Sequence, residues 1–124
     1  MKKLNNFNKY FDTYTGKLKT VLHSLDKQKI FQSAELLIKT IKTNNTIFVC
    51  GNGGSHAIAN HYVCDYFKVL SQETNLKVKI KSLCSDDSLI SAISNDFSYD
   101  DVFSYQAERL MQKGDILILI SSSG

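Results

Sequence analysis

The sequence predicts an α/β fold, in which an open parallel sheet carries helices on both faces and is preceded by an N-terminal helical segment. Three observations predict it. Segments 46–50 and 116–120 are almost wholly apolar, as in strands that are buried on both faces. Segments with helical periodicity stand before and between them. Each strand runs directly into small polar residues, as expected where strands of such a sheet end in ligand-binding loops.

Two helices are expected before the first strand. Apolar and aromatic residues recur at steps of three and four and predict a helix of about five turns; they are Phe7, Tyr10, Phe11, Tyr14, Leu18, Val21, Leu22 and Leu25. A second helix is expected from about Asp26 to Lys42. The aromatic half of the first helix either covers the sheet or packs on the same helix of another subunit. We prefer the second for Phe7, Tyr10 and Tyr14, because exposed aromatic stripes mark partner surfaces.

The chain is organised around a strand, a glycine-rich turn and a helix. The strand, 46–50, leads into Gly51-Asn52-Gly53-Gly54-Ser55, and the helix is expected to open at Ser55, a good N-cap residue, and to run to about Val69. Backbone N–H groups in such a turn can face an anion, usually a phosphate. The dinucleotide fingerprint lacks its third glycine, because His56 stands there, and the P-loop lysine is absent. A glycine turn that only packs a helix on a sheet is the competing interpretation.

The remainder continues the alternation of strands and helices. We expect a strand with one polar face near a sheet edge over 78–83, a short helix over 88–93, a longer helix over 99–113 and a wholly apolar, central strand over 116–120. Asp86 or Asp87 is expected to cap the short helix, residues 94–98 to break it, and Gly114 to end the longer helix.

All three strands end in a candidate ligand loop at one edge of the sheet. These loops are 51–55, 84–87 and 121–124. The chain stops at Gly124, directly after a buried strand. We therefore expect 1–124 to be a single domain that is incomplete at its C-terminus, with N-terminal helices over 1–43 and the first half of the sheet over 44–124.

Composition narrows the class of protein. The chain has 124 residues with a net charge of +3, and its lysines are scattered with no run of five, so we expect a solvated surface and no nucleic-acid partner. Cys50, Cys64 and Cys84 form an odd set without CxxC spacing, which speaks against a disulfide framework or a structural zinc site. The N-terminus lacks a signal peptide's apolar region, and no apolar run reaches the length of a membrane span. We expect a cytoplasmic protein without a membrane partner.

Five motifs in order carry a resemblance to a known family. They are Cys50-Gly51-Asn52-Gly53-Gly54-Ser55 with His61, Ile93-Ser94-Asn95-Asp96-Phe97, Asp101-Val102-Phe103, Gly114-Asp115 and Ile120-Ser121-Ser122-Ser123-Gly124. From about Phe7 onward the chain resembles the phosphoheptose isomerases, which have the sugar isomerase (SIS) fold, of flavodoxin-like type. The resemblance implies an isomerase that converts sedoheptulose 7-phosphate to glycero-manno-heptose 7-phosphate through an enediol, for heptose in surface polysaccharide.

The resemblance also implies where the substrate binds. Ser121, Ser122 and Ser123 would hold the phosphate through hydroxyl and N–H donors. Asn52, Gly53 and Gly54 would line the sugar, and Asn95 and Asp96 would approach its hydroxyls. A plain turn of serines and a simple helix stop at Asn95-Asp96 are the structural alternatives.

The proton transfer is the part of the chemistry in which this chain departs from the family. His61 and Asp65 share one helix face at i, i+4 spacing. The resemblance implies that both are zinc ligands and that the acidic residue is the general base, with the remaining zinc ligands, a glutamine and a histidine, beyond Gly124. The family usually has glutamate where this chain has Asp65, which is shorter by about 1.5 Å, one carbon–carbon step. A solvated helix pair is the alternative.

The resemblance implies a homotetramer with the site near subunit interfaces. Three other functions stay open at this point. The chain could be an isomerase for another phosphosugar, a non-catalytic SIS regulator or adaptor that binds a phosphosugar, or a non-functional remnant. A regulator or adaptor would not need His61 and Asp65, whereas an isomerase would.

Overall fold

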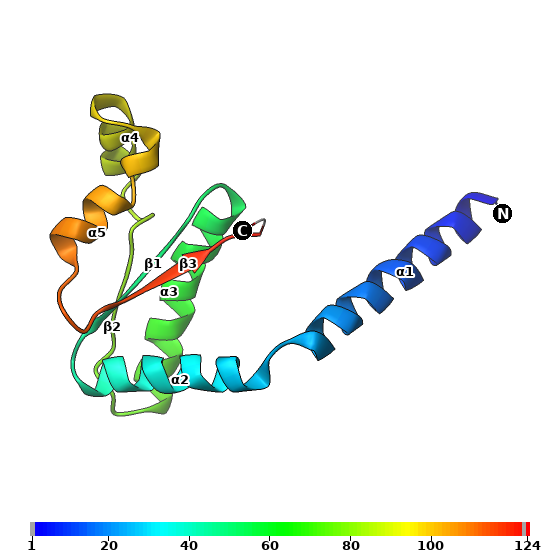
Figure 1. The fold of residues 1–124 in the computed structure, drawn as a ribbon, viewed down its shortest axis with the longest axis horizontal. Coiled ribbons are helices and arrows are strands. Elements are labelled where there is room, and N and C mark those ends of the chain that lie inside the picture. Colours follow the sequence, from blue (N-terminus) through cyan, green and yellow to red (C-terminus); the bar gives the residue numbers. More distant parts are fainter. Residues whose placement is uncertain (1, 123) are drawn as a thin grey trace. The chain divides into compact units, whose positions relative to one another are not determined.

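The computed structural model describes residues 2–122 and 124, and the side chains of 6–122 and 124. In chain order the elements are α1 (Lys2–Ser24), α2 (Lys27–Lys42), β1 (Thr46–Gly51), α3 (Gly54–Glu73), β2 (Lys79–Ser82), α4 (Asp87–Asp96), the 3-10 helix η1 (Tyr99–Asp101), α5 (Ser104–Leu110) and β3 (Ile116–Ile120). Strands alternate with helices after α2, which confirms the predicted α/β fold (Figure 1). The chain divides into two compact units, 1–34 and 35–124.

The sheet belongs to the second unit and is wholly parallel in the described residues. Its strand order is β2-β1-β3, with Ile47 of β1 opposite Ile80 of β2 and Ile116 of β3. β1 is the central strand, and its residues 47–51 are all buried. The prediction of a sheet-edge position for the 78–83 segment is confirmed, because β2 lies at one edge.

The prediction of a central, fully buried strand over 116–120 is wrong for the described residues. β3 lies at the other edge of this sheet, and none of its residues is fully buried. Leu119 is 71% exposed, because no described element covers the outer face of β3 there. A wholly apolar strand favours burial on both faces. The strand's own sequence does not show whether the described residues include the elements that would cover it.

Helices cover both faces of β1. Residues 47, 49 and 51 share one face by strand alternation, and a Cβ on Gly51 would touch Ser55 of α3, so this face lies toward α3. From the other side, Phe103, Ala107 and Met111 pack against the core. Ile41 and Leu37, near the end of α2, also join this core.

The first unit is helical. α1 runs from Lys2 to Ser24 as predicted, and its aromatic residues stack in two pairs, Phe7 with Phe11 and Tyr10 with Tyr14. Asp26 Oδ1 accepts hydrogen bonds from the N–H groups of residues 28 and 29, which is the predicted start of α2. The apolar stripe of α1 is exposed. Its burial by another subunit stays a prediction.

Several predicted helix boundaries are wrong. The N-cap of α3 is Gly53, with φ +56°, rather than Ser55, because a left-handed residue turns the chain two residues earlier and places Ser55 inside the first turn. α3 also continues through Glu73, beyond the predicted end at Val69. α4 begins after the predicted cap Asp86, but it runs on through residues 94–96 instead of breaking there.

The predicted helix over 99–113 is divided into η1 and α5. The backbone leaves the helical conformation at Met111, so Gly114 does not end the helix but forms the turn that follows, with φ +100°. Asp115 closes this turn: its Oδ2 accepts from Gln112 N (2.8 Å) and its Oδ1 accepts from Thr46 N (2.7 Å). One carboxylate therefore joins the beginnings of β1 and β3.

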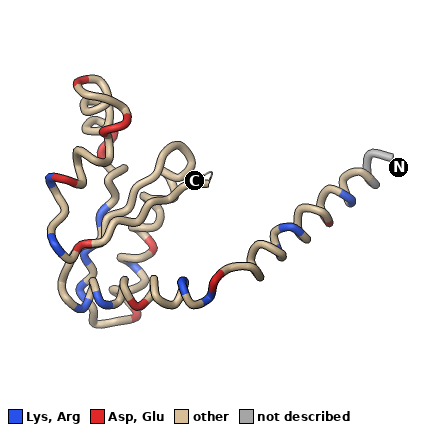
Figure 2. The backbone as a smooth tube through the Cα atoms, viewed as in Figure 1, with Lys and Arg blue, Asp and Glu red and all other residues tan. Residues whose placement is uncertain are grey.

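The charged residues do not gather in one segment. Lys and Arg are spread along the backbone and interspersed with Asp and Glu, as the sequence indicates (Figure 2). Within the part of the chain that the structure describes, no helix combines the length and the apolar character needed to cross a bilayer.

Candidate active site at the carboxyl edge of the sheet

A cavity of about 390 Å³ lies where β1 and β3 end. Figure 1 shows the turn after β1 beside the end of β3, as expected for parallel strands. The described lining of the cavity combines polar residues with apolar ones and contains no charged side chain. It consists of Cys50, Gly51, Asn52, Ser55, Phe103, Leu119, Ile120, Ser121, Ser122 and Gly124. The glycine turn and the serine segment, predicted to share one edge of the sheet, therefore meet around one space.

Gly51 makes this meeting possible. A Cβ at this position would lie 2.6 Å from Ser55 Cβ and 2.7 Å from Ile120 O, so only glycine allows the start of α3 and the end of β3 to approach so closely. The sequence shows the glycine, but the close approach of β3 becomes visible only in the structure.

Asn52 and Ser55 are the polar residues of the turn that line the cavity. The side chain of Asn52 is held from outside. Its Oδ1 accepts a hydrogen bond from Tyr99 Oη of η1, at 3.0 Å. Gly53 and Gly54 are not among the described residues that line the cavity, although they adjoin Asn52. They stand at the start of α3, where the first N–H groups of a helix have no partner within it and are available to an anion.

The serine segment closes the cavity from the side of β3. Ser121 and Ser122 line it, and Gly124 N donates to Ser121 Oγ at 3.0 Å. That bond uses a lone pair of the hydroxyl and leaves its proton free to donate. Ser123, predicted as a third phosphate ligand, lies outside the described residues.

Asn95 and Asp96 occupy the last turn of α4, not a loop as predicted. Asn95 Nδ2 donates to Asp96 Oδ1 at 2.9 Å, so the two side chains bind each other. Neither is among the described residues that line the cavity. The structure therefore brings Asn52, Ser121 and Ser122 together and leaves this pair outside them.

His61 and Asp65 also lie outside the cavity. The sheet-facing side of α3 carries Ala59, Tyr62, Val63 and Tyr66, whereas His61 and Asp65 have side chains that are 75% and 61% exposed. Their Nε2 and Oδ2 atoms are 3.1 Å apart, so the predicted i, i+4 pair forms.

This pair supplies two donors of the kind that zinc binds. A zinc site takes at least three ligands from protein. Among the described residues, no group of three His, Cys, Asp or Glu side chains is placed to hold a metal ion. Residues of the described chain alone therefore do not complete a zinc site.

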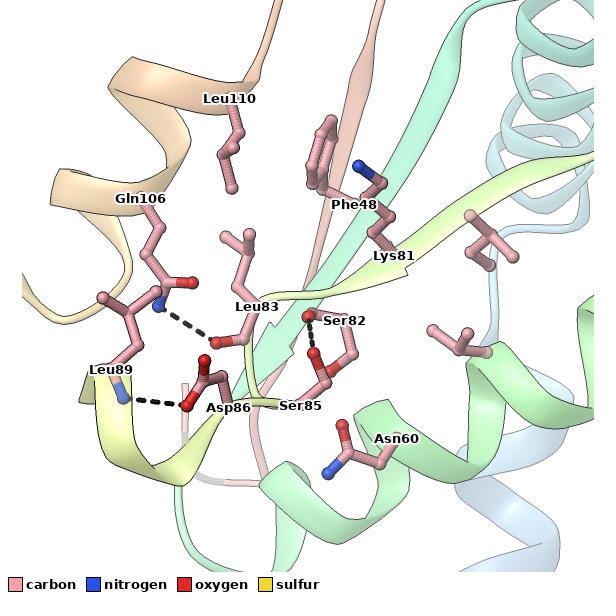
Figure 3. A pocket seen from close by; sticks show the side chains of 12 residues that line it. Phe48, Asn60, Lys81, Ser82, Leu83, Ser85, Asp86, Leu89, Gln106 and Leu110 are labelled. Atoms are coloured by element: carbon pink, nitrogen blue, oxygen red, sulfur yellow. Dashed lines mark hydrogen bonds between the residues drawn. The ribbon is translucent and has the colours of Figure 1, made fainter. Parts of the chain in front are cut away.

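The second loop, after β2, is held by one buried and one exposed polar contact beside a larger cavity of about 710 Å³. Gln106 of α5 donates from Nε2 to Leu83 O at 3.0 Å, and Leu89 N donates to Asp86 Oδ1 at 2.9 Å (Figure 3). This cavity runs past the edge strand β2, and its lining combines core side chains such as Phe48 with polar and charged residues such as Lys81 and Asp86. We regard it as a consequence of the sheet edge, and the smaller cavity as the candidate site.

Two buried thiols belong to or adjoin the candidate site: Cys50 lines the cavity and Cys84 contacts Gly51, which also lines it. Cys84 Sγ donates to Gly51 O at 3.3 Å. Burial, together with the neighbouring Cys84, raises the pKa of Cys50 to about 11, so this thiol stays protonated at neutral pH. Both cysteines are buried, whereas Cys64 is exposed.

Tyr99 and Phe103 contribute to the candidate site and Gln106 to the second loop, and none of these contributions was predicted from the sequence. Phe103 lines the cavity, Tyr99 binds Asn52, and Gln106 anchors the second loop. A polar residue at an inward position of a predicted helix was the one signal available for Gln106. The other two depend on the break between η1 and α5, which no pattern indicated.

A family model and several known proteins match the sequence of this chain. A family model described as "SIS domain" matches residues 9–124. The chain is 40% identical over 116 residues to a phosphoheptose isomerase of Helicobacter pylori (strain P12), a match that covers 94% of this chain and 59% of that protein. It is 36% identical over 115 residues to a phosphoheptose isomerase of Shewanella sp. (strain ANA-3), covering 91% of this chain and 58% of that protein.

Solved structures of the same kind superpose on this fold. A phosphoheptose isomerase from Neisseria gonorrhoeae matches with a TM-score of 0.76 and 30% identity, over 94% of this chain and 59% of that one. One from Francisella tularensis matches with a TM-score of 0.74 and 27% identity, over 98% and 62%. The chain thus spans about 58–59% of the length of these curated relatives.

Proposed function

The chain belongs to the SIS domain family, and we propose that the whole protein is a sugar-phosphate aldose–ketose isomerase. Its proposed reaction converts sedoheptulose 7-phosphate to glycero-manno-heptose 7-phosphate, for heptose in surface polysaccharide. The observation that carries the proposal is the cavity at the carboxyl ends of β1 and β3, which the glycine turn and the serine segment line together. The relatives named as phosphoheptose isomerases support the choice of substrate.

The phosphate is proposed to bind at the serine segment. Ser121 and Ser122 offer hydroxyl donors there, and Ser123 is proposed as a third ligand. The start of α3 adds the positive end of a helix dipole. Because the described lining contains no charged side chain, neutral donors would hold the anion.

The sugar is proposed to extend from the phosphate past the glycine turn. Asn52 lines the cavity. The adjoining Gly53 and Gly54, where an added Cβ would meet no heavy atom within 4 Å, are proposed to let the ligand approach the backbone closely. Asn95 and Asp96 are proposed to reach the sugar hydroxyls from the last turn of α4. That role requires α4 to move toward the cavity or the sugar to extend beyond the space described.

The chemical step is a proton transfer between carbons 1 and 2 through an enediol, and Asp65 is proposed as its general base. Asp65 follows Ser55 by ten residues on α3, so it lies about 15 Å farther along the helix axis, at 1.5 Å per residue. The carboxylate of one chain therefore serves its own cavity only if the substrate extends along α3. A second copy of the chain, as in the proposed homotetramer, offers the other source of this carboxylate.

Zinc is proposed at His61 and Asp65, in combination with donors that the described residues do not supply. Bound there, the ion would act as an electrophile beside the developing oxyanion. No other part of the proposed function depends on it.

One observation favours a second function, that of a non-catalytic phosphosugar-binding regulator or adaptor. His61 and Asp65 are exposed and lie outside the cavity, so the described chain has a place for a phosphosugar without a base beside it. Both functions require the cavity to bind a phosphosugar. Only the isomerase requires His61 and Asp65.

Product analysis with a panel of phosphorylated ketoses separates them in the full natural protein. Isomerase function predicts turnover of sedoheptulose 7-phosphate that Asp65→Asn abolishes and Asp65→Glu preserves or raises. Binding of the sugar phosphate without turnover, unchanged by Asp65→Asn, would establish the regulator. Absence of both binding and turnover would refute the proposed function.

A further inference from the structure

Tyr99 lies outside the candidate cavity but makes a hydrogen bond to a residue that lines it. Its hydroxyl donates to Asn52 Oδ1 at 3.0 Å, across 47 positions in the chain. We propose that Tyr99 is a positioning residue of the site: its hydroxyl holds the Asn52 carboxamide so that the N–H groups of that amide serve the sugar-phosphate ligand. This inference rests on the proposed function, since it concerns how the same cavity recognises its substrate.

The chemistry of a carboxamide explains why a partner matters. One end of the group accepts hydrogen bonds and the other donates two, and rotation about its last torsion exchanges them. Tyr99 engages the oxygen, so Nδ2 is left to donate to a ligand. A sugar phosphate presents hydroxyl and phosphate oxygens, all of which accept such a bond.

Without Tyr99, nothing described holds the amide in one orientation. Asn52 is exposed and stands between Gly51 and Gly53, on a turn where its neighbours offer no side chain to pack against. The amide would then present its oxygen and its nitrogen in turn. A ligand that needs the donor would meet the correct end only part of the time, which weakens binding by that fraction.

The Tyr99 hydroxyl is not needed to hold η1 together. Ser98 Oγ accepts from Asp100 N at 3.2 Å, and Val102 N donates to Tyr99 O at 3.3 Å through the backbone. Val102 anchors the segment with a side chain that is only 2% exposed. Tyr99 itself is 55% exposed, so removal of its hydroxyl leaves no buried group unpaired.

The same contact joins two parts of the proposed site. η1 follows directly after α4, whose last turn carries Asn95 and Asp96. The bond from Tyr99 therefore links the glycine turn to the segment that is proposed to reach the sugar hydroxyls. His56 and Asp87, whose Nε2 and Oδ1 atoms are 3.5 Å apart, make a second tie between the start of α3 and the start of α4.

Steady-state kinetics test the proposal in the full natural protein with sedoheptulose 7-phosphate. Tyr99→Phe keeps the ring and removes the hydroxyl. We expect KM to rise about 3- to 10-fold with kcat changed by less than about twofold, as for the loss of one neutral hydrogen bond that orients a ligand contact. In an Asn52→Ala background the same substitution should have no further effect, because the hydroxyl acts through Asn52.

Tyr105→Phe is the matched control. Tyr105 stacks on Phe97 with ring centroids 5.0 Å apart, and Arg109 lies 3.5 Å over its ring, contacts that do not use the hydroxyl. Its KM and kcat should equal those of the wild type. A purely structural effect of losing a phenol in this region would appear in both variants.

The side-chain amide signal of Asn52, observed by ¹⁵N NMR without ligand, gives a readout that does not depend on activity. Tyr99→Phe should shift this signal and Tyr105→Phe should not. If the wild type turns over no phosphorylated ketose, the proposed function fails, while the amide signal still decides the positioning role. The inference would be overturned if Tyr99→Phe left the Asn52 amide signal unchanged. It would also be overturned if the effects of Tyr99→Phe and Asn52→Ala on KM were additive.

Discussion

Replacement of Gly51 by alanine tests how closely β1, α3 and β3 approach at the site. The added Cβ would stand 2.6 Å from Ser55 Cβ and 2.7 Å from Ile120 O. Carbon atoms in contact prefer separations of about 3.5–4.0 Å. Both neighbours are fixed to the backbone, so no side-chain rotation relieves the overlap, and α3 or β3 has to move by roughly 1 Å.

The expected cost follows from that rigidity. Overpacking a well-packed site costs about 1–3 kcal/mol, and two rigid neighbours place Gly51→Ala at about 3 kcal/mol. For a chain of this size each kcal/mol lowers the melting temperature by about 4 °C, so the variant should melt about 12 °C below the wild type.

Thermal and urea unfolding of the purified variants measure this cost. Gly54→Ala is the matched control in the same turn, because its Cβ would meet no heavy atom within 4 Å. Its stability should stay within about 0.5 kcal/mol of the wild type. A Gly51→Ala protein that melts with the wild type, or a Gly54→Ala protein that loses as much stability, would refute the close approach.

Three further predictions concern the contacts that position the site. Asp115→Ala removes the carboxylate that joins the beginnings of β1 and β3, and it should lower the free energy of unfolding by about 2 kcal/mol. Asp115→Asn should lower it by less. Equal urea midpoints for the wild type and the two variants would contradict this role. Gln106→Leu leaves the buried carbonyl of Leu83 without its donor and should cost about 1–3 kcal/mol, measured in the same way; an unchanged midpoint would show that the bond is dispensable. Burial raises the pKa of Cys50 from 9.0 to about 11 and that of Tyr62 from 10.0 to about 12, so the folded state keeps protons that the unfolded chain loses, and stability should fall as the pH rises above 9. Urea midpoints between about pH 8 and pH 11 test this, and a Cys50→Ala variant should lose part of the decline; a flat profile would contradict it.

The elements of the fold could be predicted because their patterns are local. The strand at 46–50 and the helices around it follow from apolar periodicity and from caps such as Asp26 and Asp86, all of which lie within a few residues of what they determine. The edge position of β2 followed from its alternating lysines.

The wrong predictions concern helix boundaries and strand order, which depend on tertiary contacts. α3 begins at Gly54 because Gly53 adopts a left-handed conformation, which an open glycine turn permits but its sequence does not specify. The helix expected over 99–113 is divided between Asp101 and Ser104, where the intervening Val102 is buried. The apolar segment 116–120 was correctly predicted as a strand, but its place in the order depends on which partners the chain supplies.

The candidate site divides in the same way. The meeting of Asn52 with Ser121 and Ser122 could be predicted, because the carboxyl ends of parallel strands share an edge. The position of Asp65 could not be predicted. Helical spacing pairs Asp65 with His61 but does not determine whether that face of α3 lies toward the cavity or toward solvent. Tyr99 had no sequence signal, since its contact joins segments 47 residues apart.

The claim that the glycine turn and the serine segment together bind a phosphorylated sugar is tested most directly by an NMR titration that follows backbone amides. With sedoheptulose 7-phosphate, we expect the amide signals of Gly53, Gly54, Ser121 and Ser122 to shift, and we expect much weaker shifts with unphosphorylated sedoheptulose. Shifts confined to other parts of the sheet, or equal responses to the two sugars, would contradict it.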